Sequence, residues 1–111
     1  MTVSREYREY VMEQLGRIVP VTGRSMFGGF GMYSEGRFFG LIADDVVFLK
    51  VDETNRGDFE RAGKGAFRPY GEESRPMNYY ELPGELLEDV EALRPWVEKA
   101  LAVASSKKMK R

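Results

Sequence analysis

The stretch Arg24-Ser-Met-Phe-Gly-Gly-Phe-Gly-Met-Tyr-Ser-Glu-Gly-Arg-Phe-Phe-Gly-Leu-Ile-Ala-Asp-Asp-Val-Val-Phe-Leu-Lys-Val-Asp52 decides the fold. Three runs within it, 26–33, 37–43 and 46–51, are rich in aromatic and β-branched residues, a composition typical of strands. The segments between them, 34–36 and 44–45, are short and contain turn-forming residues. Connections this short leave room only for antiparallel pairing, so the stretch predicts a three-stranded β-meander.

Apolar side chains are expected on both faces of this meander. Phe38 alternates with Phe39, and Phe48 alternates with Leu49. A half-exposed antiparallel sheet should instead alternate apolar with polar residues. The pattern predicts either helices or loops on both sides of the sheet, or a surface for a partner. We name Phe30, Phe38 and Phe48 as the candidate protein-interaction face.

An amphipathic helix is predicted ahead of the meander. Its apolar residues recur at spacings of three and four, which places them on one helical stripe. This stripe consists of Val3, Tyr7, Tyr10, Val11, Leu15 and Ile18. Pro20 ends the helix before the first strand.

A second, short helix is predicted after the meander, near 54–62. Asp52 is its expected N-cap, Gly63 its expected C′ residue, and Phe59 its single large apolar anchor. Two further strands, 66–70 and 77–82, follow and are joined by the loop 71–76. The last helix carries Trp96 and contains Pro95, so it either begins near 91–94 or bends there after a separate short turn around 85–89.

Composition bounds the class of protein. The chain of 111 residues predicts one domain, residues 1–106, with a basic tail at 107–111. It contains no cysteine and no histidine, which removes thiolate chemistry, the usual general base and the commonest metal ligand. No apolar run reaches the length of a membrane helix and no secretory signal is visible, so we expect a cytoplasmic location and no membrane contact.

Charge argues against specific nucleic-acid binding. The chain has 17 basic and 18 acidic residues, but four of the basic ones lie in the last five positions. Without them the body carries 13 basic against 18 acidic residues, a charge of about −5 that repels phosphate. We therefore expect no specific nucleic acid as a partner of this domain by itself.

Motifs for chemistry are sparse. Gly28, Gly29 and Gly31 lack the lysine and hydroxyl residue that end a phosphate loop, and a bulge or a close helix approach explains them better. The run 29–33 resembles an RNA-binding signature but has Met32 where an aromatic residue is needed. We expect no catalysis, cofactor or metal. A deep polar pocket with a buried Arg24, Lys50 or Tyr79 would favour an enzyme or a small-ligand protein.

Several motifs in order resemble one family. They are Arg24-Ser-Met-Phe-Gly-Gly-Phe-Gly-Met-Tyr33, Phe39-Gly-Leu-Ile-Ala-Asp44, Leu49-Lys-Val-Asp52, Phe67 with Tyr70, Met77-Asn-Tyr-Tyr-Glu-Leu-Pro83, and the helix 93–104 with Trp96. Together they resemble the N-terminal domain of the TfoX/Sxy competence regulators, in a stand-alone form, over roughly residues 3–104.

The resemblance implies a fold and a role. The fold is α+β, a two-layer α/β sandwich of the secretion-chaperone-like kind, with a five-stranded antiparallel sheet and the order α-β-β-β-α-β-β-α. The family's regulators act as coactivators beside the cyclic-AMP receptor protein at competence promoters, and the full regulators usually carry a second domain that we do not expect here. No catalytic or ligand residues follow from the resemblance.

We therefore expect a non-enzymatic protein-interaction domain that resembles competence coactivators. Its expected partner is a protein of the transcription machinery or the cyclic-AMP receptor protein. A homodimer is the simplest way to cover an apolar sheet face. A stand-alone adaptor unrelated to competence is the alternative, followed by a small-ligand-binding protein or an enzyme.

Overall fold

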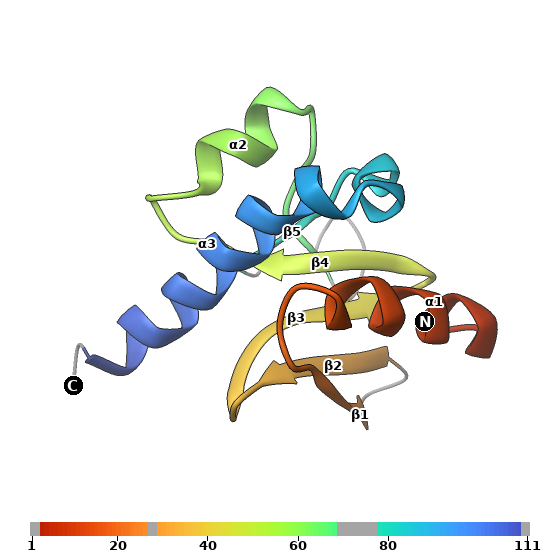
Figure 1. Cartoon of the computed structure of the whole chain (residues 1–111). Coiled ribbons are helices and arrows are strands. Elements are labelled where there is room, and N and C mark those ends of the chain that lie inside the picture. The colour runs from red at the N-terminus through yellow and green to blue at the C-terminus, as the bar shows by residue number, and fades with distance from the viewer. Residues whose placement is uncertain (1–2, 27–28, 69–77, 110–111) are drawn as a thin grey trace.

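Five antiparallel strands form one sheet in the order β1-β2-β3-β4-β5, and the helices cover one of its faces (Figure 1). This computed structural model describes residues 3–26, 29–68 and 78–109. The elements are α1 Arg5–Gly16, β1 Thr22–Met26, β2 Gly29–Ser34, β3 Arg37–Ala43, β4 Val46–Lys50, α2 Arg56–Arg61, β5 Tyr79–Glu81, the 3₁₀ turn η1 Gly84–Glu88, and α3 Val90–Met109. The predicted α+β fold with a five-stranded antiparallel sheet is confirmed.

The five strands are not all the predicted ones. The run expected as a single strand over 26–33 is split between β1 and β2, which pair as a hairpin. Of the strand expected over 66–70, the described residues 66–68 form one bridge, between Ala66 and Tyr80. Pro69, Tyr70, the predicted loop 71–76 and Met77 lie outside the described residues. The sequence pattern missed β1 because this strand is mostly exposed and contains little apolar side chain.

The core lies between the sheet and the helices. Its largest side chains on the sheet are fully buried, because they point from the strands toward α1 and α3. They are Met32, Phe39, Ile42, Val47 and Leu49 from the sheet, which meet Val11, Leu15, Leu93, Val97 and Ala100 from the helices. The stripe predicted for α1 therefore supplies Val11 and Leu15 to the centre of the core.

A bulge in β3 changes which residues face the core. Met32 pairs with Gly40, but the next pair is Tyr33 with Phe38, so Phe39 is the extra residue. Phe39 consequently joins the core together with Ile42, three positions away. A simple alternation would have put Phe39 and Ile42 on opposite faces, and that expectation is wrong.

The two turns of the meander have the predicted chemistry. Asp44 and Asp45 have φ values of 53° and 56°, and Glu35 and Gly36 have 52° and 82°. Two successive residues with positive φ match the twist of a tight hairpin. Asp45 also accepts a hydrogen bond through Oδ1 from the backbone N–H of Ser4, at 2.7 Å, which fixes the start of α1 to the β3–β4 turn.

The short helix α2 depends on one anchor, as predicted. Phe59 is 1% exposed and its ring contacts those of Tyr80 and Trp96, with centroids 5.9 and 4.9 Å away. Gly63, with φ of 76°, follows the C-cap as predicted. Asp52 is not the N-cap, because the helix begins only at Arg56. Its Oδ1 instead accepts hydrogen bonds from the backbone N–H and hydroxyl of Thr54.

The C-terminal helix follows a separate turn, as in the second of the two predicted arrangements. The turn η1 precedes α3, and Asp89 accepts a hydrogen bond from the backbone N–H of Ala92 at the start of the helix. Pro95 lies inside α3, and the helix continues to Met109, into the segment expected as a tail. Lys110 and Arg111 lie outside the described residues. No helix in the described part of the chain is long and apolar enough to span a membrane.

Candidate protein-interaction surface

The sheet face turned away from α1 and α3 carries aromatic residues from four neighbouring strands. We call this the outer face and define it by Tyr33 of β2, Phe38 of β3, Phe48 of β4 and Tyr79 of β5, with Phe67 from the segment beside β5. Tyr33, Phe38, Phe48 and Phe67 are partly exposed, whereas the core residues on the same strands are buried. The antiparallel pleat explains this division, because alternate side chains leave opposite faces.

The rings of the outer face contact one another. Tyr33 and Phe38 have centroids 5.0 Å apart, Phe38 and Tyr79 5.6 Å, and Phe48 and Phe67 4.8 Å. These centroid distances lie within the range of about 4.5–7 Å found for interacting aromatic pairs. The contacts hold each ring in a fixed orientation, which reduces the entropy that a partner's binding would cost.

Two cations lie beside the aromatic residues of the outer face, which include the strip formed by Tyr33, Phe38 and Tyr79. The guanidinium of Arg24 lies 5.9 Å from the ring centroid of Tyr33, and the ammonium of Lys50 lies 5.6 Å from that of Tyr79. Both distances are within the range of a cation–π contact. The outer face is thus apolar in the middle and positively charged at two points of its border.

Tyr79 is the least accessible residue of the strip, with 8% of its surface exposed. Burial, and secondarily the nearby Tyr33, raises the pKa of the Tyr79 hydroxyl to about 12. A phenol with so high a pKa stays protonated at neutral pH and acts as a packing residue, not as a general base.

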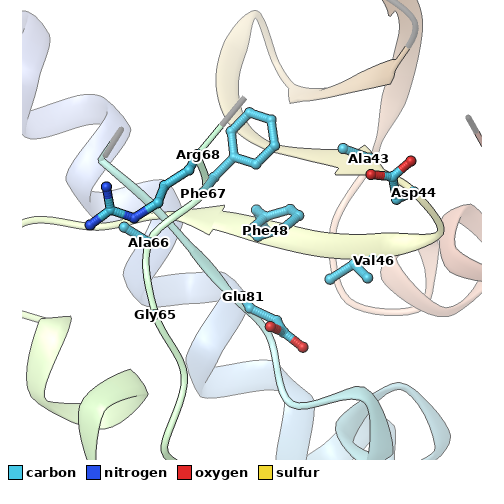
Figure 2. A pocket seen from close by; sticks show the side chains of 9 residues that line it. All are labelled: Ala43, Asp44, Val46, Phe48, Gly65, Ala66, Phe67, Arg68 and Glu81. Carbon is cyan, nitrogen blue, oxygen red and sulfur yellow. The ribbon is translucent and has the colours of Figure 1, made fainter. Parts of the chain in front are cut away.

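A pocket of about 290 Å³ opens on the outer face at the β5 end of the sheet (Figure 2). Phe48 and Phe67 form its apolar part, and the charged residues Asp44, Arg68 and Glu81 stand around it. Figure 2 shows these three charged groups pointing in different directions, so they do not converge on one point. Lys64 pairs with Glu81 at 3.5 Å. The pocket is at the lower limit of small-molecule sites and suits a single inserted side chain.

Phe30 does not belong to the outer face. Its ring lies 5.1 Å from the guanidinium of Arg8 on α1, and it packs against the core on the helix side. The reason is alternation along β2, which sends Phe30 and Met32 to one side and Tyr33 to the other. The prediction that Phe30, Phe38 and Phe48 share one face is therefore wrong for Phe30, while Phe38 and Phe48 do lie on the same face.

Of the residues named for an enzyme, Lys50 and Tyr79 are neighbours on β4 and β5, whereas Arg24 lies apart on β1. Arg24 is exposed, Lys50 is partly buried and Tyr79 is buried, and none of the three lines the pocket. Within the described residues there is no group of three or more carboxylates placed to hold a metal ion. The arrangement therefore offers apolar area and border charge, which suit binding.

Sequence reasoning missed Phe67 as part of the surface. It was assigned to a strand of its own, whereas only its backbone N–H joins the sheet, by a 2.6 Å hydrogen bond to the carbonyl of Tyr79. The segment Gly63-Lys64-Gly65 before it was the available signal, because two glycines beside an aromatic residue mark a chain that changes direction.

Comparison with known proteins gives one result at the level of a family. No curated protein matches the chain. The family model described as the TfoX N-terminal domain matches residues 13–104, which include the last turn of α1, the whole described sheet and α3 up to Ala104. A match over that much of a 111-residue chain shows the family. This chain belongs to the TfoX N-terminal domain family.

Proposed function

We propose that this protein is a non-enzymatic regulatory domain that acts in the cytoplasm by binding another protein through its outer face. The observation that carries the proposal is the aromatic strip Tyr33–Phe38–Tyr79, in which Tyr33 and Phe38 are partly exposed, with the adjoining partly exposed pair of Phe48 and Phe67. Membership of the TfoX N-terminal domain family supports a competence-related regulatory role at the level of the family.

The chemistry of the outer face suits a protein partner. Aromatic residues are enriched in the centres of protein interfaces, and charged residues are placed at their borders. The outer face has this distribution, with Phe38 in the middle and Arg24 at the border. The pocket beside Phe48 adds a hollow into which an apolar side chain of the partner could insert as an anchor.

We propose that the partner belongs to the transcription machinery, with the cyclic-AMP receptor protein as the first candidate. A stand-alone adaptor with no role in competence uses the same surface but a different partner. The two functions are separated by the identity of the protein bound and not by the fold.

The test measures binding of purified cyclic-AMP receptor protein and of RNA polymerase to the immobilised domain. Wild type is compared with Phe38→Lys and Phe48→Lys. A charge in the centre of the interface should weaken binding by about tenfold or more. Tyr10→Lys is the matched control, because Tyr10 is an exposed aromatic residue on α1, away from the outer face.

The expected result is tight binding of one of the two proteins by wild type and Tyr10→Lys, and loss of binding in both outer-face variants with the circular dichroism spectrum retained. Binding unaffected by Phe38→Lys and Phe48→Lys would refute the outer face as the site. No binding of either protein by wild type would refute the role in transcription and favour the adaptor.

A further inference from the structure

One edge of the sheet is covered by another segment of the chain, and the opposite edge is open in the described structure. The edge at β5 is covered by the segment 65–67, through hydrogen bonds from Glu81 N–H to the Gly65 carbonyl and from Phe67 N–H to the Tyr79 carbonyl. The edge at β1 pairs with β2 only, and no other described segment is bonded to it. Thr22, Gly23, Arg24 and Ser25 are all exposed.

An open edge presents unpaired backbone N–H and carbonyl groups, which can pair with another strand. Proteins usually block such edges with proline, inward-pointing charges or bulges. The strand β1 contains no proline, and its five residues pair with β2 in continuous register without a bulge. Its one protecting feature is a single charge, Arg24.

The surroundings of this edge are positively charged on both sides of the sheet. On the outer face Arg24 lies over the ring of Tyr33, and on the helix face Arg8 lies over the ring of Phe30. The sequence from Val19 to Ser34 contains no acidic residue, although the chain as a whole has a net charge of −1. The β1 edge is therefore a locally basic part of the molecule.

On the helix face the ring of Phe30 occupies the space over Gly23. A Cβ atom at Gly23 would overlap the ring of Phe30, so the ring lies directly over the glycine. A strand placed next to β1 would meet this ring with no β1 side chain between them. An apolar side chain opposite Gly23 can pack on the ring of Phe30, and the side chain opposite Arg24 emerges on the outer face.

We propose that the edge of β1 binds an extended segment of a partner protein by strand addition, and that this segment carries an acidic side chain opposite Arg24 and apolar side chains at the flanking positions. Backbone hydrogen bonds to β1 supply the pairing, and Arg24 and Phe30 supply the selectivity. This inference rests on the proposed function, a protein-binding role, and adds a second contact region that adjoins the outer face at Arg24 and Tyr33.

Charge decides against a second copy of this chain as the occupant. A two-fold pairing that uses all five residues of β1 is centred on Arg24, and it sets Arg24 opposite its own copy. Like charges directly opposite each other destabilise a strand pair. An acidic segment in the same place turns that repulsion into an attraction.

The experiment titrates the isotope-labelled full chain with a seven-residue peptide that alternates valine and glutamate, and follows the backbone amide resonances. A peptide that alternates valine and lysine is the control ligand. We expect shifts concentrated in Thr22–Met26, with the covered edge Tyr79–Glu81 unchanged. The glutamate peptide should bind about tenfold more tightly than the lysine peptide, because like charges are rejected at such contacts.

Substitution of Arg24 tests whether this residue selects the charge of the bound peptide. Arg24→Glu should reverse the preference between the two peptides, whereas Arg56→Glu on α2, the same change of charge away from β1, should leave the preference as in wild type. Retained amide resonances of β2 to β4 show that each variant is folded.

Several outcomes would overturn the proposal. These are no shift in β1 with either peptide, equal binding of both peptides, or shifts confined to the outer face around Phe38 and Phe48. Concentration-dependent shifts of β1 in the absence of peptide would show that a second copy occupies the edge, which also refutes it. The titration contains no transcription protein. A negative result would therefore refute the binding site at the β1 edge without bearing on the outer face, which the binding assay with the Phe38 and Phe48 variants tests separately.

Discussion

The two faces of the sheet are built from the same strands and the same kinds of residues, but they differ in what covers them. On the helix face Met32, Phe39 and Leu49 are completely buried by α1 and α3. On the outer face Tyr33, Phe38 and Phe48 are held by ring-to-ring contacts and stay partly exposed. The comparison shows that apolar composition does not identify the helix-side core of this protein, because four of the seven aromatic residues in the five described strands lie on the outer face.

Because the two faces differ in burial, we expect them to have separate roles. Burial against α1 and α3 supplies the stability, since the free energy of folding scales with the apolar area removed from water. The outer face retains exposed apolar area, which is the usual mark of a contact site. Stability and the proposed binding should therefore be separable by substitutions on opposite faces of one strand.

The largest effect is expected from neighbouring residues of β3. Phe39→Ala should lower the free energy of unfolding by about 3–5 kcal/mol, because it empties a fully buried site. Phe38→Ala should lower it by about 1–2 kcal/mol, since its ring is partly exposed and loses contacts with Tyr33 and Tyr79. Urea denaturation of the two variants measures both values. Equal losses would mean that the outer face also forms part of the core.

A smaller effect is expected at the bulge that divides the faces. A Cβ atom at Gly40 would lie 2.7 Å from the backbone carbonyl oxygen of Phe48, and a backbone atom cannot easily move away. Gly40→Ala should therefore cost about 1–3 kcal/mol, as overpacking usually does.

Gly65→Ala is the control for this substitution, because nothing lies within 4 Å of its added Cβ. We expect its free energy of unfolding to stay within about 0.5 kcal/mol of wild type. Thermal denaturation of the two variants compares them directly. A Gly40→Ala protein as stable as wild type would show that the bulge can relax.

The bulge also marks the limit of what the sequence predicts. The strand expected over 37–43 has the observed bounds, and the anchor Phe59 and both tight turns were predicted correctly. These features depend on local residue types and spacing. The insertion of Phe39 depends on the pairing between β2 and β3, which local patterns do not encode.

The candidate site was predicted in part, for the same reason. Phe38 and Phe48 lie together on the outer face, but Phe30 lies on the other side of the sheet. Assigning faces across three strands requires their relative register, and each strand's own alternation does not supply it. The strand β1 was missed because an exposed edge strand needs few apolar residues.

An effect of alkaline pH is expected at the centre of the outer face. Burial raises the pKa of Tyr79 from its ordinary value of 10.0 to about 12 in the folded protein. Below pH 10 the hydroxyl is protonated in both folded and unfolded chains, so its contribution is fully present. As the pH rises from 10 to 12 the unfolded chain loses its proton first, and the free energy of unfolding falls.

Urea denaturation between pH 8 and the onset of alkaline unfolding measures this loss. Tyr79→Phe should make the slope of the free energy of unfolding against pH shallower above pH 10 than in wild type. Parallel slopes for wild type and Tyr79→Phe would show that Tyr79 ionises as freely in the folded chain as in the unfolded one. The buried centre of the outer face would then be open to water.

The smallest effect is expected from the charges on the helix side. Asp58 of α2 pairs with Lys99 of α3 at 2.8 Å and with Arg61 at 2.6 Å. The hydrogen bond from Lys99, followed by the charges of both cations, holds the pKa of Asp58 below its usual value. The pair is partly exposed to solvent, so a double-mutant cycle with Asp58→Asn and Lys99→Met should give a coupling below about 1 kcal/mol. Because the pKa is lowered, this coupling should be present at neutral pH and should disappear as the pH falls through the lowered pKa.

The pair Glu91–Arg94, which is more exposed, should show a still smaller coupling energy. A coupling as large as the Phe39→Ala loss would mean that charge, and not apolar burial, holds α2 against α3 and stabilises the helix face.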